Sequence, residues 1–423
     1  MLRRGTLIVI VTVVCTVLLL LWSPSKWHSY AWPSALGHTN TETVGHGGIN
    51  PKAWMEGREK GLFREPKVDA KSPYPAGRLK PAGSNYTRTL VVPKMKGEDT
   101  SWIQQELGDM LSSGVLDTAI YAMDDDTAPL HPIMNKGHEV MAYLSYIIDF
   151  YNSLPDVLVF MHAHRFARHN NLLLEKDSAL MLRHLSPERV TREGYMNLRC
   201  HWDPGCPDWM RPNDADVKGD RKEQEVMAAA WTELFPGQAL PDVLAQPCCA
   251  QFAVSRERVQ VIPRDRFIAL REWVVHTDLD DFLSGRVFEY TWQYIFTSSA
   301  FHCPSMSACY CDGYGICFGD AEKFDYYFEL EHYRKLYQEE LEALQSAAAN
   351  ETTAREHDGN DPGYGRQEMV EVPTVGREEW LTDEILRLKS EMDRSKADAL
   401  ERGRDPAQRA RESGRHGREG EGF

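Results

Sequence analysis

The sequence predicts an α/β fold in which a mostly parallel, Rossmann-like sheet is flanked by helices. Short apolar runs alternate with amphipathic helical segments from residue 89 onward, which is the pattern of successive βαβ units. The run from Val157 to Met161 is continuously apolar, as in a strand that is buried on both faces. Just before it, apolar residues recur at helical spacing from His138 to Tyr151, and Pro155 in the following turn ends that helix. Right-handed crossovers through such helices would make the strands parallel.

The expected elements follow in chain order. Strands are predicted over 89–92, 118–123 and 157–161, with helices over 101–111 and 138–151 between them. Beyond the third strand the pattern predicts a buried strand over 247–255 and helices over 176–185, 222–235, 263–275, 278–297 and 321–347. Residues 190–212 are expected to be rich in loops, residues 303–317 to form a compact cysteine knot, and residues 378–402 to form a charged helix.

The N-terminus predicts a membrane anchor. Arg3 and Arg4 precede an uncharged apolar run over residues 6–22, close to the length that crosses a bilayer. A cleaved signal peptide is the alternative, but its apolar core would be shorter and would end in small residues, whereas this run ends in Leu-Leu-Leu-Trp. We therefore expect a cytosolic tail over 1–5 and a transmembrane signal anchor over 6–22. A stem over 23–88, a globular luminal domain over 89–347 and a charged, largely disordered tail over 348–423 would follow.

This organisation describes a single-pass type II membrane protein of the secretory pathway that faces the Golgi or ER lumen. Asn85 and Asn350 stand in glycosylation sequons, which is consistent with a luminal body. The chain has 423 residues, of which 42% are hydrophobic, enough for a sizeable core. Its formal charge of −15 disfavours nucleic acid as a partner, because such binding depends on neutralising phosphates.

The cysteines predict disulfides. Cys15 lies in the apolar run, and the other eight of the nine cysteines follow it. In an oxidising lumen, disulfides are a better interpretation than zinc for the four cysteines of the knot, which are Cys303, Cys309, Cys311 and Cys317. Cys200 is expected to bond Cys206 and close a small loop. Adjacent Cys248 and Cys249 are expected not to pair with each other, so that each reaches another partner or remains a thiol.

Two groups of residues are candidate metal ligands. His162 and His164 end the third strand, where alternation points both side chains to one side, and His169 follows. Asp124, Asp125 and Asp126 follow the preceding strand, and clustered carboxylates suit Mg²⁺ or Mn²⁺. The alternatives are that the histidines cap the strand through hydrogen bonds and that the aspartates form an ordinary solvated turn.

A candidate anion site lies at the start of the helix that follows residue 138. Asn135, Lys136, Gly137 and Glu139 precede and open this helix, and a lysine beside free backbone N–H groups suits a diphosphate. Capping with a loop glycine is the alternative. Because ligands of open α/β sheets bind at the carboxyl ends of strands, we look for the site near His162.

Five motifs carry a resemblance to a known family. They are NKGHE, FMHAHR, NLRCHWDPGCP, CCAQFAVSRER and CYCDGYGICFG. Together they resemble a widespread fungal domain-of-unknown-function family over about Leu90 to Gly319. This resemblance implies no established reaction.

A weaker resemblance is to glycosyltransferases of the GT-A type, which place a luminal α/β domain behind a type II anchor and stem. It implies a GT-A-like sheet, a metal and a sugar nucleotide held by a DxD motif after a central strand, and a glycan acceptor. This sequence departs from that pattern, because the strand that begins at Val157 ends in HAH and the aspartates follow an earlier strand. The segment from Gln251 to Arg256 also looks similar to strands of those enzymes.

The first functional hypothesis is therefore a glycosyltransferase-like enzyme. The aspartates or the histidines would hold Mn²⁺ or Mg²⁺, and Lys136 would face the diphosphate. Glu257 or Asp203 would act as a base, and Arg165, Gln251 and Arg256 would contact substrate. One alternative is a non-catalytic glycan-binding or scaffold protein that uses its tryptophan-rich loop, and another is a metal-dependent hydrolase built on the histidines.

Overall fold

The computed structural model describes residues 73–214, 221–357 and 376–414. The expected cytosolic tail, the anchor over 6–22 and most of the stem lie outside these residues. Within the described part of the chain, no helix combines the length and the apolar character that crossing a bilayer requires.

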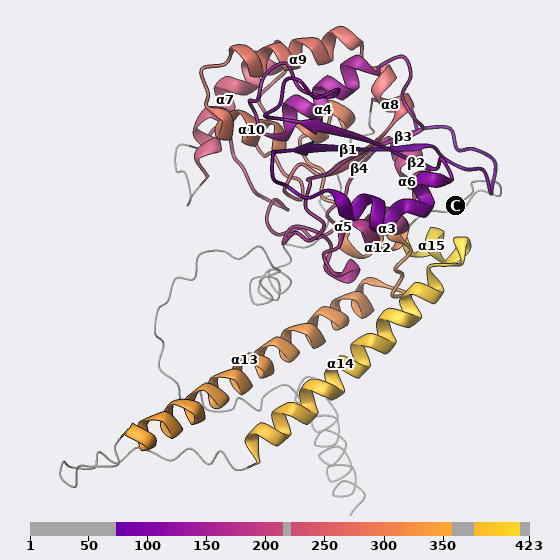
Figure 1. Ribbon diagram of the computed structural model, residues 1–423. Helices are drawn as coiled ribbons and strands as arrows, with labels where there is room; N and C mark the ends of the chain where they lie inside the picture. The colour runs from indigo at the N-terminus through magenta and orange to yellow at the C-terminus, as the bar shows by residue number, and fades with distance from the viewer. Residues whose placement is uncertain (1–72, 215–220, 358–375, 415–423) are drawn as a thin grey trace, which may run out of the picture. The chain divides into compact units, whose positions relative to one another are not determined.

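Five strands form one mixed sheet with the order β2-β1-β3-β5-β4 (Figure 1). Their bounds are Arg88–Lys94 (β1), Leu116–Ala122 (β2), Val157–Phe160 (β3), Tyr195–Asn197 (β4) and Phe252–Ser255 (β5). β1 pairs in parallel with β2 and with β3, whereas β5 pairs antiparallel with β3 and with β4. The α/β class is confirmed, but the expected mostly parallel sheet is corrected to a mixed one. β4 ends at the same edge at which the chain re-enters the sheet, so β5 has to run in the opposite direction.

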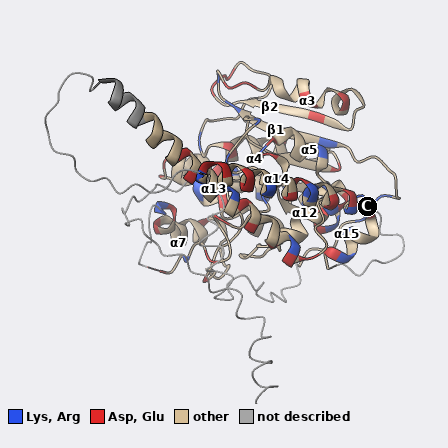
Figure 2. Ribbon diagram, turned by 90° about the horizontal axis from the view of Figure 1, so that it is seen from below, with Lys and Arg blue, Asp and Glu red and all other residues tan. Residues whose placement is uncertain are grey.

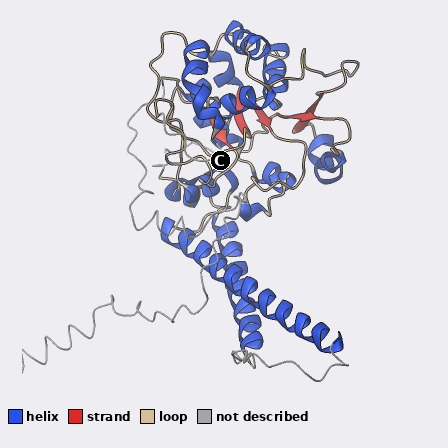
Figure 3. Ribbon diagram, turned by 90° about the vertical axis from the view of Figure 1, so that its left-hand side faces the viewer, coloured by secondary structure: helices blue, strands red, loops and turns tan. Residues whose placement is uncertain are grey.

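Helices cover both faces of the sheet (Figure 3). On one face lie α4 (Glu139–Asp149), α7 (Lys222–Leu234), α9 (Arg264–His276), α10 (Asp281–Glu289) and α11 (Trp292–Thr297). On the other lie α3 (Ser101–Ser112), α5 (Ser178–His184), α6 (Pro187–Glu193) and α12 (Met306–Tyr314). In β3, Val157 and Val159 pack on the second set, and Leu158 and Phe160 pack on the first. The two-sided burial predicted for this strand is confirmed.

Several segments differ from the sequence prediction. The single helix expected over 278–297 is two helices, α10 and α11, and the Thr291 hydroxyl between them donates to the Val287 carbonyl, a bond that competes with continuous helical pairing. The segment expected to be loop-rich begins with the end of α6 and contains β4, and the expected cysteine knot contains α12. The strand expected over 247–255 is shorter, because β5 begins only at Phe252.

The C-terminal part forms α13 (Ala321–His357), α14 (Arg377–Arg402) and α15 (Pro406–Glu412), and α14 matches the charged helix expected over 378–402. α13 and α14 pack on each other through Leu330, Leu388 and Met392. Figure 2 shows acidic and basic residues interspersed along both helices, in keeping with ion pairs such as the one between Arg387 and Glu384.

All eight cysteines of the described residues form disulfides, as expected for the four of the knot, but two expectations about their pairing are wrong. The bonds are Cys200–Cys309, Cys206–Cys303, Cys248–Cys249 and Cys311–Cys317. Cys200 and Cys206 do not pair with each other, because segments about 100 residues further along the chain lie beside each of them. The neighbours Cys248 and Cys249 do pair, because the backbone at Cys249 takes a φ of 89°.

Candidate functional site

A cleft of about 370 Å³ lies where β1, β2 and β3 end. Pro93 and Lys94 at the end of β1, Met123 after β2 and His162 after β3 all line it. Ligands of open α/β sheets bind at this position. The polar side chains around the cleft are those of Lys94, Glu98, Asn135, His138, Glu139, His162, His164 and Asp281.

His138 is held in the cleft by the start of α10. The Asp281 carboxylate accepts a hydrogen bond from the His138 backbone N–H at 3.1 Å, and its second oxygen lies 3.2 Å from His138 Nδ1. Gly137 and His138 both have positive φ values, 74° and 50°. A Cβ on Gly285 would lie 2.8 Å from the His138 ring, so glycine there lets α10 approach closely.

Glu139 opens α4 and has a strongly shifted pKa. Burial raises the pKa of its carboxyl group to about 8, and the carboxylates of Glu289 and Asp281 raise it further against the opposing charge of Arg286. The group therefore exchanges a proton close to neutral pH. A carboxyl group with this property can serve as a general acid or base, or can ionise when a cation binds.

His162 and His169 form a hydrogen-bonded pair. His162 Nδ1 and His169 Nε2 lie 3.0 Å apart, so one ring donates and the other accepts. Burial lowers the pKa of His162 to about 3 and that of His169 to about 4; the neighbouring histidines lower the first further, and the Arg199 guanidinium lowers the second further. Both rings are therefore neutral at pH 7, and the pair keeps one ring nitrogen with a free lone pair that can bind a metal.

His164 stands on the open side of the cleft. Its Nε2 lies 3.2 Å from a carboxylate oxygen of Glu98, and its ring is 61% exposed. The backbone behind it is fixed, because the Ser178 hydroxyl donates to the His164 carbonyl at 3.0 Å. An exposed imidazole oriented by a carboxylate is the arrangement of a general base that can reach a bound substrate.

The cleft contains carboxylates and imidazoles that are candidate metal ligands. Among the residues that the structure describes, the groups of three metal ligands within 4.8 Å of one another are Cys248, Cys249 and Glu289, and Cys311, Cys317 and Glu412. Both groups contain disulfides, and neither lies in the cleft. The cleft instead offers carboxylates in separate pairs with histidines. Mg²⁺-type sites commonly need one or two carboxylates together with substrate phosphates, so Glu139, Asp281 and Glu98 could hold Mn²⁺ or Mg²⁺ with a bound diphosphate.

Other predicted residues lie at the edge of this region. Asp124, Asp125 and Asp126 are exposed on the turn after β2, where Asp124 accepts from the Lys96 N–H and Asp125 from Thr127. These are the contacts of a solvated turn. Lys136 does not face the cleft, since its ammonium donates to the Thr277 carbonyl at 2.5 Å.

Some predicted residues are not brought to the cleft. Because β5 runs antiparallel, Arg256 and Glu257 at its carboxyl end lie at the opposite edge of the sheet. There Arg256 pairs with Asp156 at 2.9 Å, and Glu257 accepts from the Arg78 N–H. The contact with Arg78 also ties part of the segment before β1 to the domain.

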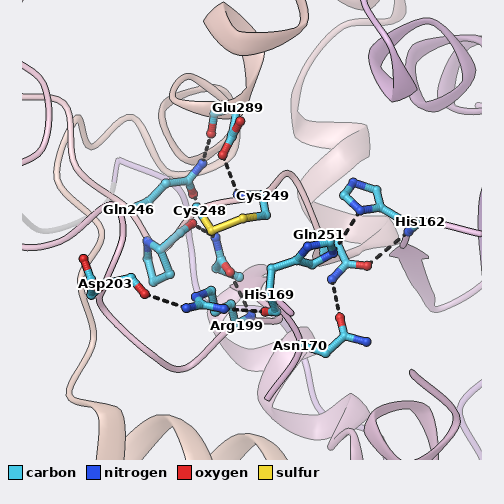
Figure 4. Close-up of a disulfide and its surroundings, with 12 residues drawn as sticks. His162, His169, Asn170, Arg199, Asp203, Gln246, Cys248, Cys249, Gln251 and Glu289 are labelled. Atoms are coloured by element: carbon cyan, nitrogen blue, oxygen red, sulfur yellow. Dashed lines mark hydrogen bonds between the residues drawn. A yellow bond between two sulfur atoms is a disulfide. The ribbon is translucent and has the colours of Figure 1, made fainter. Parts of the chain in front are cut away.

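Arg165 and Asp203 have structural contacts. Arg165 bonds Asp177 at 2.8 Å and also Glu106. Asp203 is exposed, and its backbone carbonyl accepts from Arg199 (Figure 4).

Four polar residues of the cleft were not singled out from the sequence as site residues: Lys94, Glu98, His138 and Asp281. Lys94 could have been predicted, because it follows the first expected strand and strands that run parallel to β3 end at the same edge of the sheet. His138 could have been predicted from its place in the NKGHE motif. Glu98 and Asp281 lie in polar segments with no distinguishing pattern, and only the packing of α10 and of the loop after β1 brings them to the cleft.

Gln251 lies beneath the histidines and connects them to a wider network. Its Oε1 accepts from the His162 N–H at 3.1 Å, and its Nε2 donates to Asn170 Oδ1 at 2.8 Å. Figure 4 shows this network extending along the chain to Cys248 and Cys249, where the Cys249 N–H donates to Glu289 at 2.7 Å. Gln251 was predicted to contact substrate, whereas here it supports the backbone of His162.

The comparisons with known proteins agree with the resemblance to a domain-of-unknown-function family. A family model described as "Protein of unknown function (DUF3431)" matches residues 90–312, which is more than half of the chain. No curated protein matches the sequence. A crystal structure of glucosyl-3-phosphoglycerate synthase from Mycobacterium tuberculosis, in complex with Mn²⁺, UDP-glucose and phosphoglyceric acid, is similar over 44% of this chain and 66% of that one. The identity is 16% and the TM-score 0.23, so this weak likeness to a GT-A enzyme carries no argument about activity.

Proposed function

The chain belongs to the family described as protein of unknown function (DUF3431), and we propose that it is a metal-dependent, glycosyltransferase-like enzyme that acts on glycans in the secretory pathway. The observation that carries the proposal is the cleft at the carboxyl edge of the sheet. Carboxylates, imidazoles and a lysine line it together, and these groups can hold a metal ion, accept a proton from an acceptor hydroxyl and bind a diphosphate during transfer from a sugar nucleotide.

Each part of the cleft has a role in this proposal. Glu139 and Asp281 would hold Mn²⁺ or Mg²⁺, which neutralises negative charge on a diphosphate. Lys94, at the end of β1, would bind a phosphate oxygen. His164, oriented by Glu98, would take the proton of the acceptor hydroxyl as its oxygen bonds to the anomeric carbon and the diphosphate leaves with its bonding electrons.

The disulfides of the described domain support the proposed location. They are typical of an oxidising compartment, which fits a type II protein whose body faces the Golgi or ER lumen. This topology rests on Arg3, Arg4 and the apolar run over 6–22 and is part of the proposal.

The test is a screen of UDP- and GDP-sugars for hydrolysis and transfer with Mn²⁺ or Mg²⁺. His164→Ala should lower the rate by about 100-fold or more and leave the melting temperature nearly unchanged. His276→Ala is the matched control, because His276 is an exposed histidine whose ring lies 3.6 Å from Glu272, away from the cleft. The proposal is overturned if no sugar nucleotide is consumed with either metal, or if both variants lose activity equally.

A metal-dependent hydrolase is the second candidate. It is favoured by the neutral His162, which lines the same cleft as Glu139, a carboxyl group whose proton exchanges near neutral pH. Metal binding without turnover of any sugar nucleotide would favour this candidate. The non-catalytic glycan-binding alternative has less support, because Trp202 of the tryptophan-rich loop is only 5% exposed and its indole N–H donates to the Pro304 carbonyl.

A further inference from the structure

We propose that the Cys248–Cys249 disulfide is a redox modification site, and that its reduction by a dithiol releases Gln251 and loosens the hydrogen-bonded pair of His162 and His169. The inference goes beyond the proposed function, because it concerns a switch in the framework of the cleft and holds for any reaction that the cleft performs.

The first support is the backbone at the disulfide. A bond between neighbouring cysteines closes a ring through a single peptide unit, and Cys249 and Ala250 have φ values of 89° and 49°. Residues with a side chain disfavour this left-handed region, so the conformation persists only when its surroundings impose it. Opening the ring removes one of the constraints that impose it.

The remaining constraints at this turn are hydrogen bonds from its backbone. The Cys248 N–H donates to the Pro204 carbonyl at 3.0 Å, and the Cys249 N–H donates to Glu289 Oε1 at 2.7 Å. The other oxygen of Glu289 pairs with Arg286 at 2.5 Å, which fixes the acceptor in place. Two hydrogen bonds of its own backbone therefore hold the turn, and the disulfide closes it (Figure 4). On either side of it, the Pro247 carbonyl accepts from the Asn197 side chain and the Gln251 carbonyl accepts from the Leu198 N–H.

The second support is the short path from this turn to the histidines. Gln251 stands two residues after Cys249 and is 2% exposed. Its side chain accepts the His162 N–H and bonds Asn170, which follows His169 directly. A change in the backbone at Cys249 and Ala250 therefore moves a side chain that bonds both of the segments carrying the histidine pair.

The chemistry of the switch balances with a dithiol as the reductant. Cys248 is 3% exposed, whereas Cys249 is partly exposed, so a thiolate of the reductant reaches Cys249 Sγ. Attack there forms a mixed disulfide and releases Cys248 as a thiolate that takes up a proton. The second thiol of the reductant then displaces Cys249, which leaves the reductant as a disulfide and the protein with two thiols. A disulfide-bonded oxidant reverses the two steps.

The experiment measures hydrogen exchange of the amides around His162 in the purified protein, without substrate or metal. Dithiothreitol is titrated until alkylation and mass spectrometry show Cys248 and Cys249 reduced and the three other disulfides intact. The exchange rate in peptides that contain His162 should then rise by about tenfold, because the left-handed turn that positions its acceptor is no longer enforced. Reoxidation should restore the slow rate.

Variants separate this path from a general loosening of the protein. Cys248→Ser with Cys249→Ser should exchange rapidly at His162 whether or not reductant is present. Gln251→Ala should do the same with its cysteines unchanged, which keeps the test decisive if the serine variant fails to fold. Cys311→Ser with Cys317→Ser, which removes a disulfide elsewhere, should retain the response to reductant.

The inference is overturned if Cys248 and Cys249 are free thiols in the oxidised protein, or if their reduction leaves His162 exchange unchanged. It is also overturned if the Cys248 and Cys249 serine variant still responds to reductant as the unsubstituted protein does. None of these measurements uses a sugar nucleotide, so failure of the proposed function leaves their result standing.

Discussion

Replacing Glu139 with glutamine should abolish the pH dependence of metal binding to the cleft between pH 7 and pH 9. A carboxyl group with a pKa of about 8 is about nine-tenths protonated at pH 7 and about one-tenth protonated at pH 9. A metal that binds the carboxylate has to displace this proton, so the apparent Mn²⁺ affinity should rise about tenfold over this interval. Binding at pH 7 should release about 0.9 proton.

The assay is titration calorimetry with Mn²⁺ at both pH values, in buffers that differ in ionisation enthalpy so that released protons are counted. Glu139→Gln should bind Mn²⁺ more weakly and with equal affinity at pH 7 and pH 9. Glu257→Gln, at the opposite edge of the sheet, is the control and should behave like the unsubstituted protein. The reasoning is refuted if the unsubstituted protein shows no change in affinity, or if Glu139→Gln retains the tenfold change.

The same carboxyl group also affects folding stability. Its pKa in the folded state, about 8, lies above the ordinary value of 4.5, so between these values the folded protein holds a proton that the unfolded chain has lost. Without metal, this group lowers the free energy of unfolding as the pH rises through that window. Urea denaturation of the Glu139→Gln variant should therefore show a smaller loss of stability from pH 5 to pH 8 than the unsubstituted protein.

Two further predictions concern the domain and its topology. Asp312 is 1% exposed and bonds Arg189 at 2.6 Å and Arg192 at 2.5 Å, so Asp312→Asn should lower the free energy of unfolding by about 3–5 kcal/mol in urea denaturation. Asp109→Asn, which breaks an exposed pair, should lower the free energy of unfolding far less, and an equal loss would contradict the importance of burial. Asn85 is exposed, and the expected glycan there predicts that Asn85→Gln removes part of the gel shift caused by glycosidase treatment. A body without glycan at Asn85 would count against the luminal topology.

The strands and their burial could be predicted from local sequence patterns. Alternate side chains of a strand point to opposite faces, so the continuous apolar run of β3 predicts burial on both faces. The structure confirms this prediction, because side chains of β3 belong to both hydrophobic cores. The position of His162 at the edge of the sheet follows from the end of that run. The helices α3, α7 and α9 were predicted for a similar reason, since each buries one face at helical spacing. The helix α4 was also predicted, but Val140 to Ile148 are all buried, so the single buried face expected for it is wrong.

The disulfide pairing depends on distance in space, which the spacing of cysteines along the chain does not contain. Cys200 and Cys206 are near neighbours in sequence, yet each bonds a cysteine about 100 residues away because that segment packs beside it. The bond between Cys248 and Cys249 requires a left-handed backbone at Cys249, and a residue other than glycine gives no sign of such a conformation in the sequence.

The sequence by itself determined that polar and charged side chains follow the carboxyl ends of the predicted strands. The tertiary structure decided which of these side chains line the same cleft. The antiparallel direction of β5 carries Arg256 and Glu257 to the far edge of the sheet. The packing of α10 on Gly137 and His138 brings Asp281 into the cleft. Burial raises the pKa of Glu139, and the nearby Glu289 carboxylate raises it further. Local patterns report the periodicity of a chain segment, whereas strand direction, helix contacts and burial depend on residues far apart in the sequence.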